Sequence, residues 1–387
     1  MDAEVAVIGV GTMGAMTLWQ LARRGVKAVG IERFNPGHDR SGAGGESRLF
    51  RTAYLEGSHY VPLLRAARDQ WRELEEETGH DLLTLNGGLM IGGADTTFLR
   101  NVRASIEDHD IAHEVLDPAA MRRRYPQHPL GDGEVAILDH ESGYVRPELA
   151  VTLAADAAER HGARVVRHRA VTRIEPDASG VTIIAGDETI RARTAVVAAG
   201  AWTNALLPGL TPRLDVQRLI MTWFPARDVS RFRTDNFPIF IRQTGDYDIS
   251  GWPSLDGASV KVAVNHGWDH VADPDRLDRS VDDRLTALIR NAVAELLPDL
   301  YPEPVRVGVY MDGYTADKDS FVGPVPGLDN VIVLGGFSGH GFKMSPAIGR
   351  ATAELVLDGG TTLPIGHLDP QRFHPVRTVA DRLGLTG

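Results

Sequence analysis

The opening of the chain changes its hydrophobic period around a cluster of glycines. Residues 4–9 (EVAVIG) form a short apolar run typical of a buried strand, and the apolar residues after it, through Leu21, recur at helical spacing. Gly25 ends this predicted helix, and a second strand follows over residues 27–32. A strand, a helix and a strand in such a short stretch predict a βαβ unit with both strands parallel in one sheet.

The glycines of this unit form the pattern G-x-G-x-x-G. Gly9, Gly11 and Gly14 follow the first strand and open the helix, so backbone amides and the positive helix end can face a pyrophosphate. Glu32 ends the second strand, where a carboxylate suits the hydroxyls of a ribose. Close packing of a helix on a strand also demands glycine. The complete set, with its strands, helix and acidic end, predicts a dinucleotide site.

Length and composition limit the other possibilities. At 387 residues the chain exceeds what one core usually supports, so we expect two lobes. The net charge of −11 argues against nucleic acid as a partner, and no apolar run is long enough to predict a membrane span. Asp2 and Glu4 replace the basic start of a signal peptide. The absence of cysteine excludes disulfides and thiolate ligands and is compatible with the cytoplasmic location that we expect.

The rest of the sequence predicts both helices and strands. The sequence predicts helices over 60–74 and 147–162, a hairpin over 82–92 that turns at Asn86-Gly87, strands over 164–174, 181–184, 189–198 and 330–336, and a helix that opens at a Ser280–Asp283 capping box. Because the C-terminal part returns to strand, glycine turn and helix, we expect an α/β fold with a discontinuous Rossmann-type domain. It takes residues 1–80, 145–215 and 306–387. Residues 81–144 and 216–305 form a second lobe, a mixed antiparallel sheet with helices.

Four segments together resemble a known family: VIGVGTMGAMTLWQLARRGVKAVGIERF, ESRLFRTAYLEG, GWPSLDGASVKV and GGFSGHGFKMSPAIG. The chain is similar to the glutathione-reductase-like flavoproteins of the D-amino-acid-oxidase kind, and among them to the monomeric sarcosine oxidase and N-methyltryptophan oxidase family. The resemblance implies FAD and a small amine substrate. It also implies oxidation of the C–N bond of an N-methyl or cyclic amino acid by hydride transfer to flavin N5, with oxygen as the acceptor and peroxide as the product. It further favours a monomer.

The resemblance assigns four cations to catalysis. Arg48 would lie beside the flavin ring, Arg51 and Lys343 would bind the substrate carboxylate, and Lys261 would supply positive charge above N5, where oxygen becomes superoxide. A guanidinium fork suits a carboxylate well. The alternatives are arginines that pair with Glu46 or Glu56 at the surface, and a lysine on the solvated face of a strand.

The same resemblance extends the cofactor site beyond the glycine motif. The helix that follows residues 335–343 would point its positive end at the flavin. The expected cofactor-binding residues are Gly9, Gly11, Thr12, Met13, Gly14, Glu32, Arg33, Ser41, Arg48, Val171, Ala199, Gly200, Trp202, Tyr310, Gly339, Gly341, Phe342 and Lys343.

The chain departs from the family pattern at the flavin and in the pocket. Tyr310 stands where the family has the cysteine bonded to the flavin, so we expect non-covalent FAD. Ile249 and Ser250 replace an aromatic pair, and Asn265 replaces a histidine, with His266 beside it. Ile249 and Asn265 are expected to contact the substrate. No His, Asp or Glu grouping has metal-ligand spacing, so no metal is expected.

Other functions remain open at this level. An enzyme with the same cofactor and carboxylate clamp could oxidise a 2-hydroxy acid, or act as an amine dehydrogenase that passes electrons to an acceptor other than oxygen. A flavin-binding protein without turnover is a third possibility. Four cations around one pocket argue against it, because buried and unused charges carry a desolvation cost.

Overall fold

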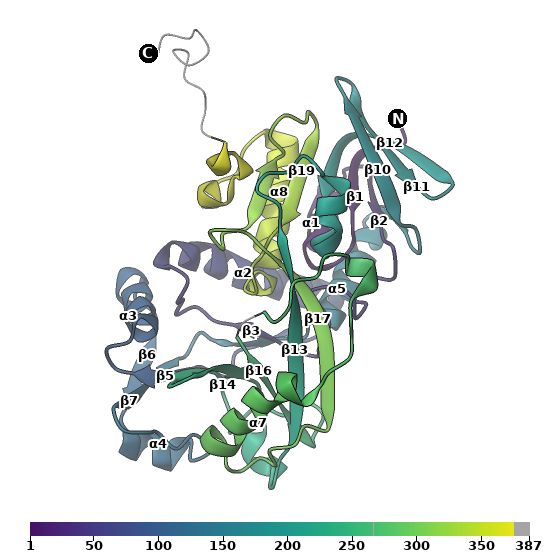
Figure 1. The fold of residues 1–387 in the computed structure, drawn as a ribbon. Helices are drawn as coiled ribbons and strands as arrows, with labels where there is room; N and C mark the ends of the chain where they lie inside the picture. Colours follow the sequence, from purple (N-terminus) through teal and green to yellow (C-terminus); the bar gives the residue numbers. More distant parts are fainter. Residues whose placement is uncertain (266, 375–387) are drawn as a thin grey trace, which may run out of the picture.

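The computed structural model describes residues 1–265 and 267–374. Segments far apart in the sequence lie together: in Figure 1 the purple N-terminal segment and the yellow C-terminal segment share the upper part of the molecule with the β10–β12 region. The lower part is built from the middle of the chain. The long strands β13 and β17 run from one part into the other.

The upper part contains a mixed sheet of eight strands. Its strands are β1 (Ala3–Ile8), β2 (Ala28–Ile31), β9 (Arg164–Val166), β10 (Val171–Asp177), β11 (Gly180–Ala185), β12 (Glu188–Val197), β18 (Phe321–Pro324) and β19 (Val331–Gly335). Strand β1 pairs in parallel with β2 and β12, β2 with β9, and β12 with β19. The predicted βαβ unit and the α/β fold class are confirmed.

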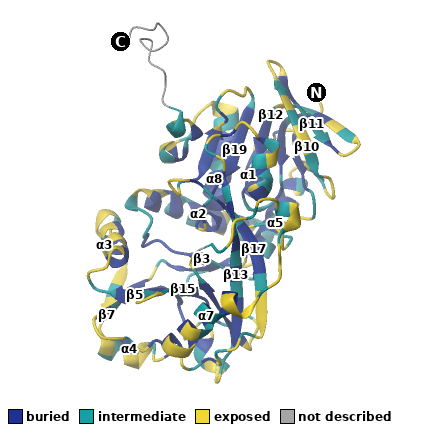
Figure 2. Ribbon diagram, in the orientation of Figure 1, coloured by how far each residue is buried: buried dark blue, intermediate teal, exposed yellow. Residues whose placement is uncertain are grey.

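Helices cover this sheet. They are α1 (Thr12–Arg23), α2 (Val61–Thr78), α5 (Pro147–Arg160) and α8 (Ser345–Asp358). Helices α1 and α8 pack closely at Gly349. A Cβ atom at this position would lie only 2.6 Å from the carbonyl carbon of Met16. Figure 2 shows the strands beneath these helices as buried, and Gly79 ends α2 in the left-handed conformation as expected.

The lower part contains a second eight-stranded sheet in the order β17-β13-β16-β15-β14-β5-β7-β6. The strands are β5 (Gly88–Gly93), β6 (His113–Leu116), β7 (Glu134–Asp139), β13 (Asp215–Pro225), β14 (Ile239–Thr244), β15 (Tyr247–Gly251), β16 (Ser259–Val264) and β17 (Arg306–Tyr314). Helix α7 (Asp283–Leu296) buries Ile289 and Val293 in a core with residues of β13 to β16. Since side chains alternate along a strand, the other residues of these strands face away from this core.

The predicted hairpin over residues 82–92 is wrong. Strand β4 (Leu83–Thr84) belongs to a three-stranded sheet with β8 (Gly143–Val145) and β3 (Arg48–Phe50), whereas β5 pairs with β7 and β14. Gly87 does turn the chain, with φ at 87°. Asn86 donates a hydrogen bond to the carbonyl of Phe237 at 3.0 Å, and the turn carries the chain from one sheet to another.

Two other local predictions need correction. Residues 164–174 form parts of two strands, β9 and β10, with His168 between them at a φ of 58°. Helix α7 is capped by Asp282 rather than by Ser280, because the Asp282 carboxylate accepts the amide of Leu285 at 3.0 Å.

The remaining helical elements connect the parts of the two lobes. They are α3 (Thr97–His109), α4 (Pro118–Arg124), α6 (Thr203–Leu206), and the 3-10 helices η1 (Ser58–Tyr60), η2 (Gly200–Trp202), η3 (Val229–Phe232), η4 (Pro274–Arg276), η5 (Phe342–Met344), η6 (Gly366–Leu368) and η7 (Pro370–Phe373). No helix in the described part of the chain has the length and apolar character of a membrane span. Strand β17 pairs with β13 of the second sheet, although residues 306–314 were expected in the nucleotide lobe. The domain boundaries themselves stay a prediction.

Candidate functional site

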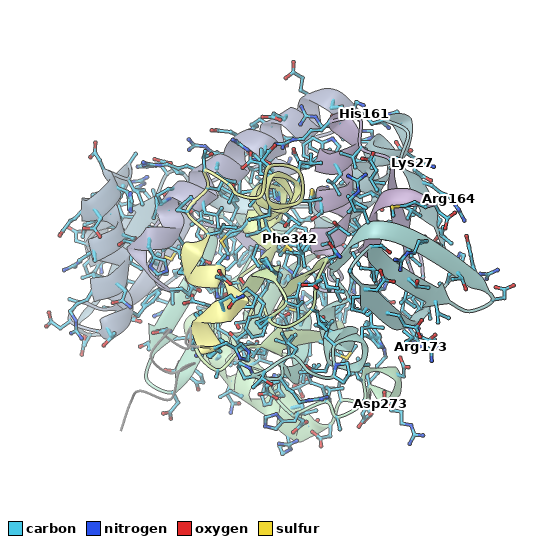
Figure 3. The ribbon with its side chains drawn as sticks, turned by 90° about the horizontal axis from the view of Figure 1, so that it is seen from above. Lys27, His161, Arg164, Arg173, Asp273 and Phe342 are labelled. Atoms are coloured by element: carbon cyan, nitrogen blue, oxygen red, sulfur yellow. The ribbon has the colours of Figure 1, made fainter. Side chains whose placement is uncertain are left out.

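A cavity of about 1110 Å³ runs between the two sheets. The cavity is lined by residues of the glycine motif, of strands β13 to β17, and of the loop between β19 and α8. Phe342 from this loop lies toward the middle of the view in Figure 3, whereas Lys27 and Arg164 lie at the periphery. The cavity therefore joins the predicted dinucleotide site to the predicted substrate lobe.

One end of the cavity is built for a phosphate group. Gly9 has a φ of 89°, and a Cβ on Gly14 would lie 1.8 Å from the Gly9 carbonyl oxygen, so side chains are excluded at both positions. The N-terminus of α1 has no side-chain cap, and the buried Thr12 hydroxyl has no hydrogen-bond partner among the described residues. Free amides and an unsatisfied hydroxyl at a helix N-terminus fit the pyrophosphate of FAD.

Glu32 is fixed beside this helix end. Its carboxylate accepts the amides of Val10 and Phe34, each at 2.8 Å, and His38 Nε2 lies 3.4 Å from it. The side chain is buried yet lines the cavity. Since a carboxylate has further lone pairs, Glu32 can still accept ribose hydroxyls.

The wall continues past Glu32 with contacts between the two lobes. Arg33 pairs with Asp275 at 2.5 Å, and the indole nitrogen of Trp202 donates to the same carboxylate at 2.7 Å. The other expected cofactor residues that line the cavity are Gly11, Met13, Ser41, Val171, Ala199 and Gly200. Gly14 lies in the packing of α1 behind them.

The loop after β19 closes the opposite side. Gly339 and Ser338 both have positive φ, and the Gly339 amide donates to the carboxylate of Asp312 at 2.7 Å. Phe342 stacks on Trp71 with ring centroids 5.9 Å apart. The loop leads through η5 into α8, so the N-terminus of α8 faces the cavity side, as the sequence predicts.

The side chains of Arg48 and Lys261 both donate hydrogen bonds to backbone carbonyls of residues 42–47. Arg48 lines the cavity and donates to the carbonyls of Gly42, Gly44 and Ser47, and burial lowers its pKa. Lys261 is only 1% exposed and donates to the carbonyls of Gly45 and Ser47 at 2.8 and 2.7 Å.

The ammonium of Lys261 is shielded from the cavity. It lies 4.0 Å from the ring centroid of Trp252, which does line the cavity, whereas Lys261 itself does not. Burial, and then the charge of Arg48, lower the pKa of Lys261 well below its usual range. The solvated strand face considered as an alternative does not describe this lysine.

Arg51 lies at the substrate end and is 4% exposed. It forms a two-point ion pair with Glu56, at 2.9 Å from Nη1 to Oε2 and 2.5 Å from Nη2 to Oε1. Burial is the largest single effect and raises the pKa of Glu56, but the charge and hydrogen bonds of Arg51 and the other basic groups nearby together outweigh it and lower this pKa to about 2. A pair of Arg51 with Glu56 was the alternative prediction, but at the protein surface. The structure places this pair inside the cavity.

Lys343 also lies close to Tyr54. Its ammonium donates to the Tyr54 hydroxyl at 3.2 Å and to the His340 carbonyl at 2.6 Å, and burial lowers its pKa well below the usual range. The Tyr54 ring lies 4.7 Å from the Arg51 guanidinium and 5.0 Å from the Lys343 ammonium. The two cations expected to bind one carboxylate thus lie close to the same aromatic ring.

His340 completes this group. Its Nδ1 lies 2.9 Å from the Tyr54 hydroxyl and its Nε2 lies 3.1 Å from the carbonyl of Lys318, so Nε2 carries the proton and Nδ1 accepts. Burial lowers the pKa of His340 to about 4. The imidazole is therefore neutral at neutral pH.

The pocket wall in the substrate lobe is polar. Ser250 donates to Asn265 at 2.5 Å, and Asn265 and Gln243 donate to the two oxygens of Asp248 at 2.6 and 2.8 Å. Ile249 is placed elsewhere: it packs in the core of the second lobe and does not line the cavity. His266 lies outside the described residues.

Tyr310 lines the cavity close to Gly44 and Gly45, and burial raises its pKa. Two residues that the sequence did not single out also belong to the site: Asp312 lines the cavity and Tyr54 contacts Lys343, while Glu56, considered only as a surface partner of Arg51, lines the cavity as well. The signal for Tyr54 and Glu56 was their place in the segment ESRLFRTAYLEG. Asp312 has no motif of its own, and only the tertiary contact between the end of β17 and the loop after β19, through the bridge of Tyr314 with Phe337, brings it there.

Comparison with known proteins identifies the family of the chain. Residues 4–355 match the family described as FAD dependent oxidoreductase. The monomeric sarcosine oxidase of Streptomyces avermitilis is 36% identical over 375 residues, which is 96% of this chain and 97% of that protein. The N-methyl-L-tryptophan oxidase of Salmonella arizonae is 31% identical over 92% of this chain and 95% of its own length.

A solved structure shows the same fold. NikD, described as an unusual amino acid oxidase essential for nikkomycin biosynthesis, superposes with a TM-score of 0.84 at 24% identity, covering 95% of this chain and 97% of its own. The match over most of the sequence, the glycine motif with Glu32, and the cavity that unites them lead to one conclusion. The chain belongs to the family of FAD-dependent oxidoreductases.

Proposed function

We propose that the chain oxidises the C–N bond of a small secondary amino acid, N-methylated or cyclic, and that oxygen accepts the electrons and becomes hydrogen peroxide. The observation that carries this proposal is the pair of buried cations, Arg51 and Lys343, at the substrate end of the cofactor cavity. Two desolvated cations on one aromatic ring need an anionic partner. A substrate carboxylate provides one, and Glu56 occupies Arg51 when no substrate is bound.

FAD, when bound, supplies the two-electron oxidising chemistry. The residues of the chain bind and orient the substrate. Arg51 offers its guanidinium fork and Lys343 its ammonium to the carboxylate. The neutral His340 and the Tyr54 hydroxyl form one hydrogen-bonded chain beside Lys343 and hold the ammonium in place. Leu49, Leu55 and Trp252 provide apolar walls that exclude water from the reacting carbon.

The polar wall formed by Gln243, Ser250 and Asn265 accommodates a substrate side chain larger or more polar than that of sarcosine. Three sequence-based expectations belong to the same proposal. FAD is held without a covalent bond, because Tyr310 stands at the position of the family cysteine. The protein is cytoplasmic, and it works as a monomer.

Peroxide formation tests the proposal directly. The purified yellow protein is offered N-methyl amino acids, cyclic amino acids and 2-hydroxy acids, each with its methyl ester as a matched control, and peroxide is measured. We expect peroxide from one of the first two classes and little from the esters. Peroxide from 2-hydroxy acids alone would identify a hydroxy acid oxidase. Flavin bleaching by an amine without peroxide would identify a dehydrogenase.

A further inference from the structure

Three potential metal ligands from distant segments meet at the outer rim of the cavity. His59 lies in η1, Asp319 precedes β18, and His367 lies in η6. One ligand atom from each lies within 4.8 Å of the other two. The two imidazole rings are 4.5 Å apart at 83° to one another. No sequence motif predicts this cluster, because each residue comes from a different part of the chain.

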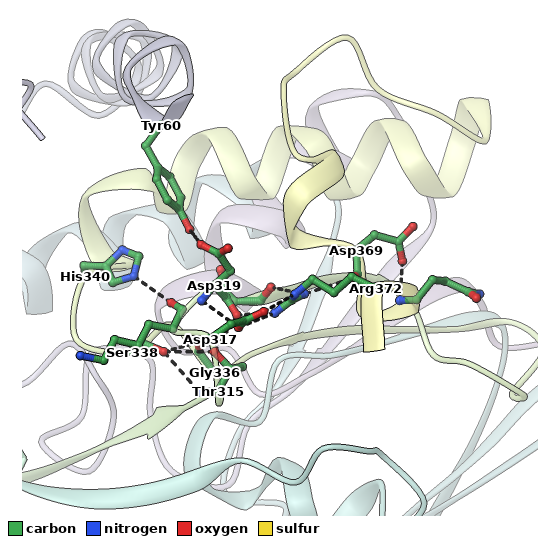
Figure 4. A network of polar contacts seen from close by, with 12 residues as sticks. Tyr60, Thr315, Asp317, Asp319, Gly336, Ser338, His340, Asp369 and Arg372 are labelled. Carbon is green, nitrogen blue, oxygen red and sulfur yellow. Dashed lines mark hydrogen bonds and ion pairs between the residues drawn. The ribbon is translucent and has the colours of Figure 1, made fainter. Parts of the chain in front are cut away.

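Other contacts hold the carboxylate of Asp319 in place. The Tyr60 hydroxyl donates to its Oδ1 at 2.5 Å, and Arg372 donates to its backbone carbonyl, as Figure 4 shows. Arg372 in turn forms an ion pair with Asp317. Because Tyr60 uses only Oδ1, the second oxygen of Asp319 remains available to a ligand on the side of the histidines.

The ring of His367 has an unused nitrogen. Its Nε2 atom is buried and has no hydrogen-bond partner within residues 1–265 and 267–374. A buried nitrogen without a partner is destabilising. A ligand that binds this nitrogen relieves that cost.

We propose that His59, Asp319 and His367 bind one divalent transition-metal ion of the zinc class, with water as the fourth ligand. Two imidazoles and one carboxylate suit Zn²⁺ and exclude Mg²⁺ and Ca²⁺, which prefer oxygen ligands. Zinc–ligand distances of about 2.0–2.2 Å require ligand atoms roughly 3.3 Å apart. The exposed His59 supplies most of the necessary movement, since it lies on a short helix after Gly57.

The site is separate from substrate oxidation. Asp319 lines the cavity, but His59 and His367 do not. The proposal therefore stands or falls independently of the proposed function. Two contacts connect it to the residues around Lys343: Tyr60, which donates to Asp319, has its ring 5.5 Å from that of His340, and the carbonyl of Lys318 meets His340 at 3.1 Å.

Equilibrium dialysis of the flavin-loaded full chain against Zn²⁺ at pH 7.5, with zinc counted by atomic absorption, tests the site. We expect about one ion per chain, and no uptake of Mg²⁺. His59→Gln and His367→Gln each remove a ligand and should weaken binding by more than roughly tenfold. His270→Gln is the matched control, because His270 forms an exposed pair with Asp215 elsewhere on the surface and its loss should change nothing.

Three results would overturn the proposal: no zinc uptake, uptake that both His59→Gln and His367→Gln leave unchanged, or equal weakening in His270→Gln. The flavin spectrum and circular dichroism check that each variant is folded. If His367→Gln does not fold, His59→Gln decides the question alone, since the His59 side chain is exposed.

Discussion

Arg51 holds both carboxylate oxygens of Glu56, at 2.9 and 2.5 Å, inside the cavity where a substrate carboxylate would bind. The two residues are five positions apart, so the pair is local and forms with the loop itself. If Arg51 binds the substrate carboxylate as proposed, Glu56 competes with the substrate for the arginine. It also keeps the buried guanidinium neutralised when no substrate is present.

Glu56→Gln should strengthen binding of a carboxylate substrate. The neutral amide competes less well for Arg51, and a charge-assisted hydrogen bond contributes about 1.5–3 kcal/mol, so apparent affinity should rise by up to roughly tenfold. Steady-state KM and flavin difference spectra measure it. Glu141→Gln is the control, because Glu141 pairs with Arg65 and Arg68 away from the cavity. Unchanged or weaker binding in Glu56→Gln would contradict the competition.

Arg51→Met and Lys343→Met should each weaken substrate binding at least about tenfold, since each removes a charge-assisted hydrogen bond to the carboxylate. FAD content should hold in both. Arg68→Met, which removes an arginine from a surface ion pair, should leave KM unchanged. Equal turnover of a substrate and its methyl ester by the unmodified protein, or normal affinity in either cavity variant, would show that these cations do not bind the carboxylate.

Acid precipitation tests the prediction that FAD is not covalently bound. The chain contains no cysteine, and Tyr310 at the corresponding position is buried with a raised pKa, which disfavours the phenolate that a covalent link would need. The yellow colour should pass into the supernatant. Fluorescence of the washed pellet measures any flavin left on the protein. Flavin that stays with the peptide chain would contradict the prediction.

The parts of the site that lie within one short segment could be predicted from the sequence. Gly9, Gly11, Gly14 and Glu32 belong to a single βαβ unit, whose local spacing specifies both the turn and the helix that follows. The loop after β19 is similar, since its glycines and the start of α8 are contiguous. Local chain geometry determines such sites, so the pattern suffices.

Contacts between distant segments could not be predicted in this way. Asn86-Gly87 has the chemistry of a hairpin turn, but partner strands for β4 and β5 lie elsewhere in the chain, and only tertiary packing selects them. The buried pair of Arg242 and Glu134 joins residues 108 positions apart. Nor does composition show that Ile249 faces the core and Ser250 the cavity, because a shift of one residue reverses the two faces of a strand.

His128 should make the protein sensitive to acid. It is buried between Phe237 and Phe240, and neither ring nitrogen has a hydrogen-bond partner in the described part of the chain. Burial, and then the charge of Arg242, lower its pKa to about 3. An unfolded histidine binds a proton near pH 6.5, so the unfolded state takes up more protons between pH 6.5 and 3. Stability is full above this window and falls as the pH drops through it.

His128→Phe should remove this dependence. Relative to the unmodified protein, the free energy of unfolding should rise by about 2 kcal/mol more at pH 5 than at pH 8. Urea unfolding at the two pH values, followed by circular dichroism, measures the difference. His80→Phe controls for the general effect of replacing a histidine, because His80 is exposed. The same pH dependence in His128→Phe and in the unmodified protein would show that His128 is not the group responsible.

Lys261 should separate the two half-reactions. When oxygen is reduced it gains negative charge, and a fixed ammonium nearby stabilises that charge, whereas substrate oxidation creates no such anion. Lys261→Met should therefore slow reoxidation of the reduced enzyme by roughly 100-fold or more, and anaerobic reduction by substrate much less. Stopped-flow absorbance follows each half-reaction separately.

The position of Lys261 makes this a demanding test. Its amine is held by the carbonyls of Gly45 and Ser47 and lies against Trp252, so an effect on oxygen requires its charge to act across the indole rather than by contact. Lys261→Arg keeps the charge and should retain much of the reoxidation rate, and Lys27→Met, an exposed lysine, should retain all of it. If Lys261→Met reoxidises normally, the lysine only ties residues 45–47 to β16. If the unmodified protein reoxidises slowly, it is a dehydrogenase and the electron acceptor is not oxygen.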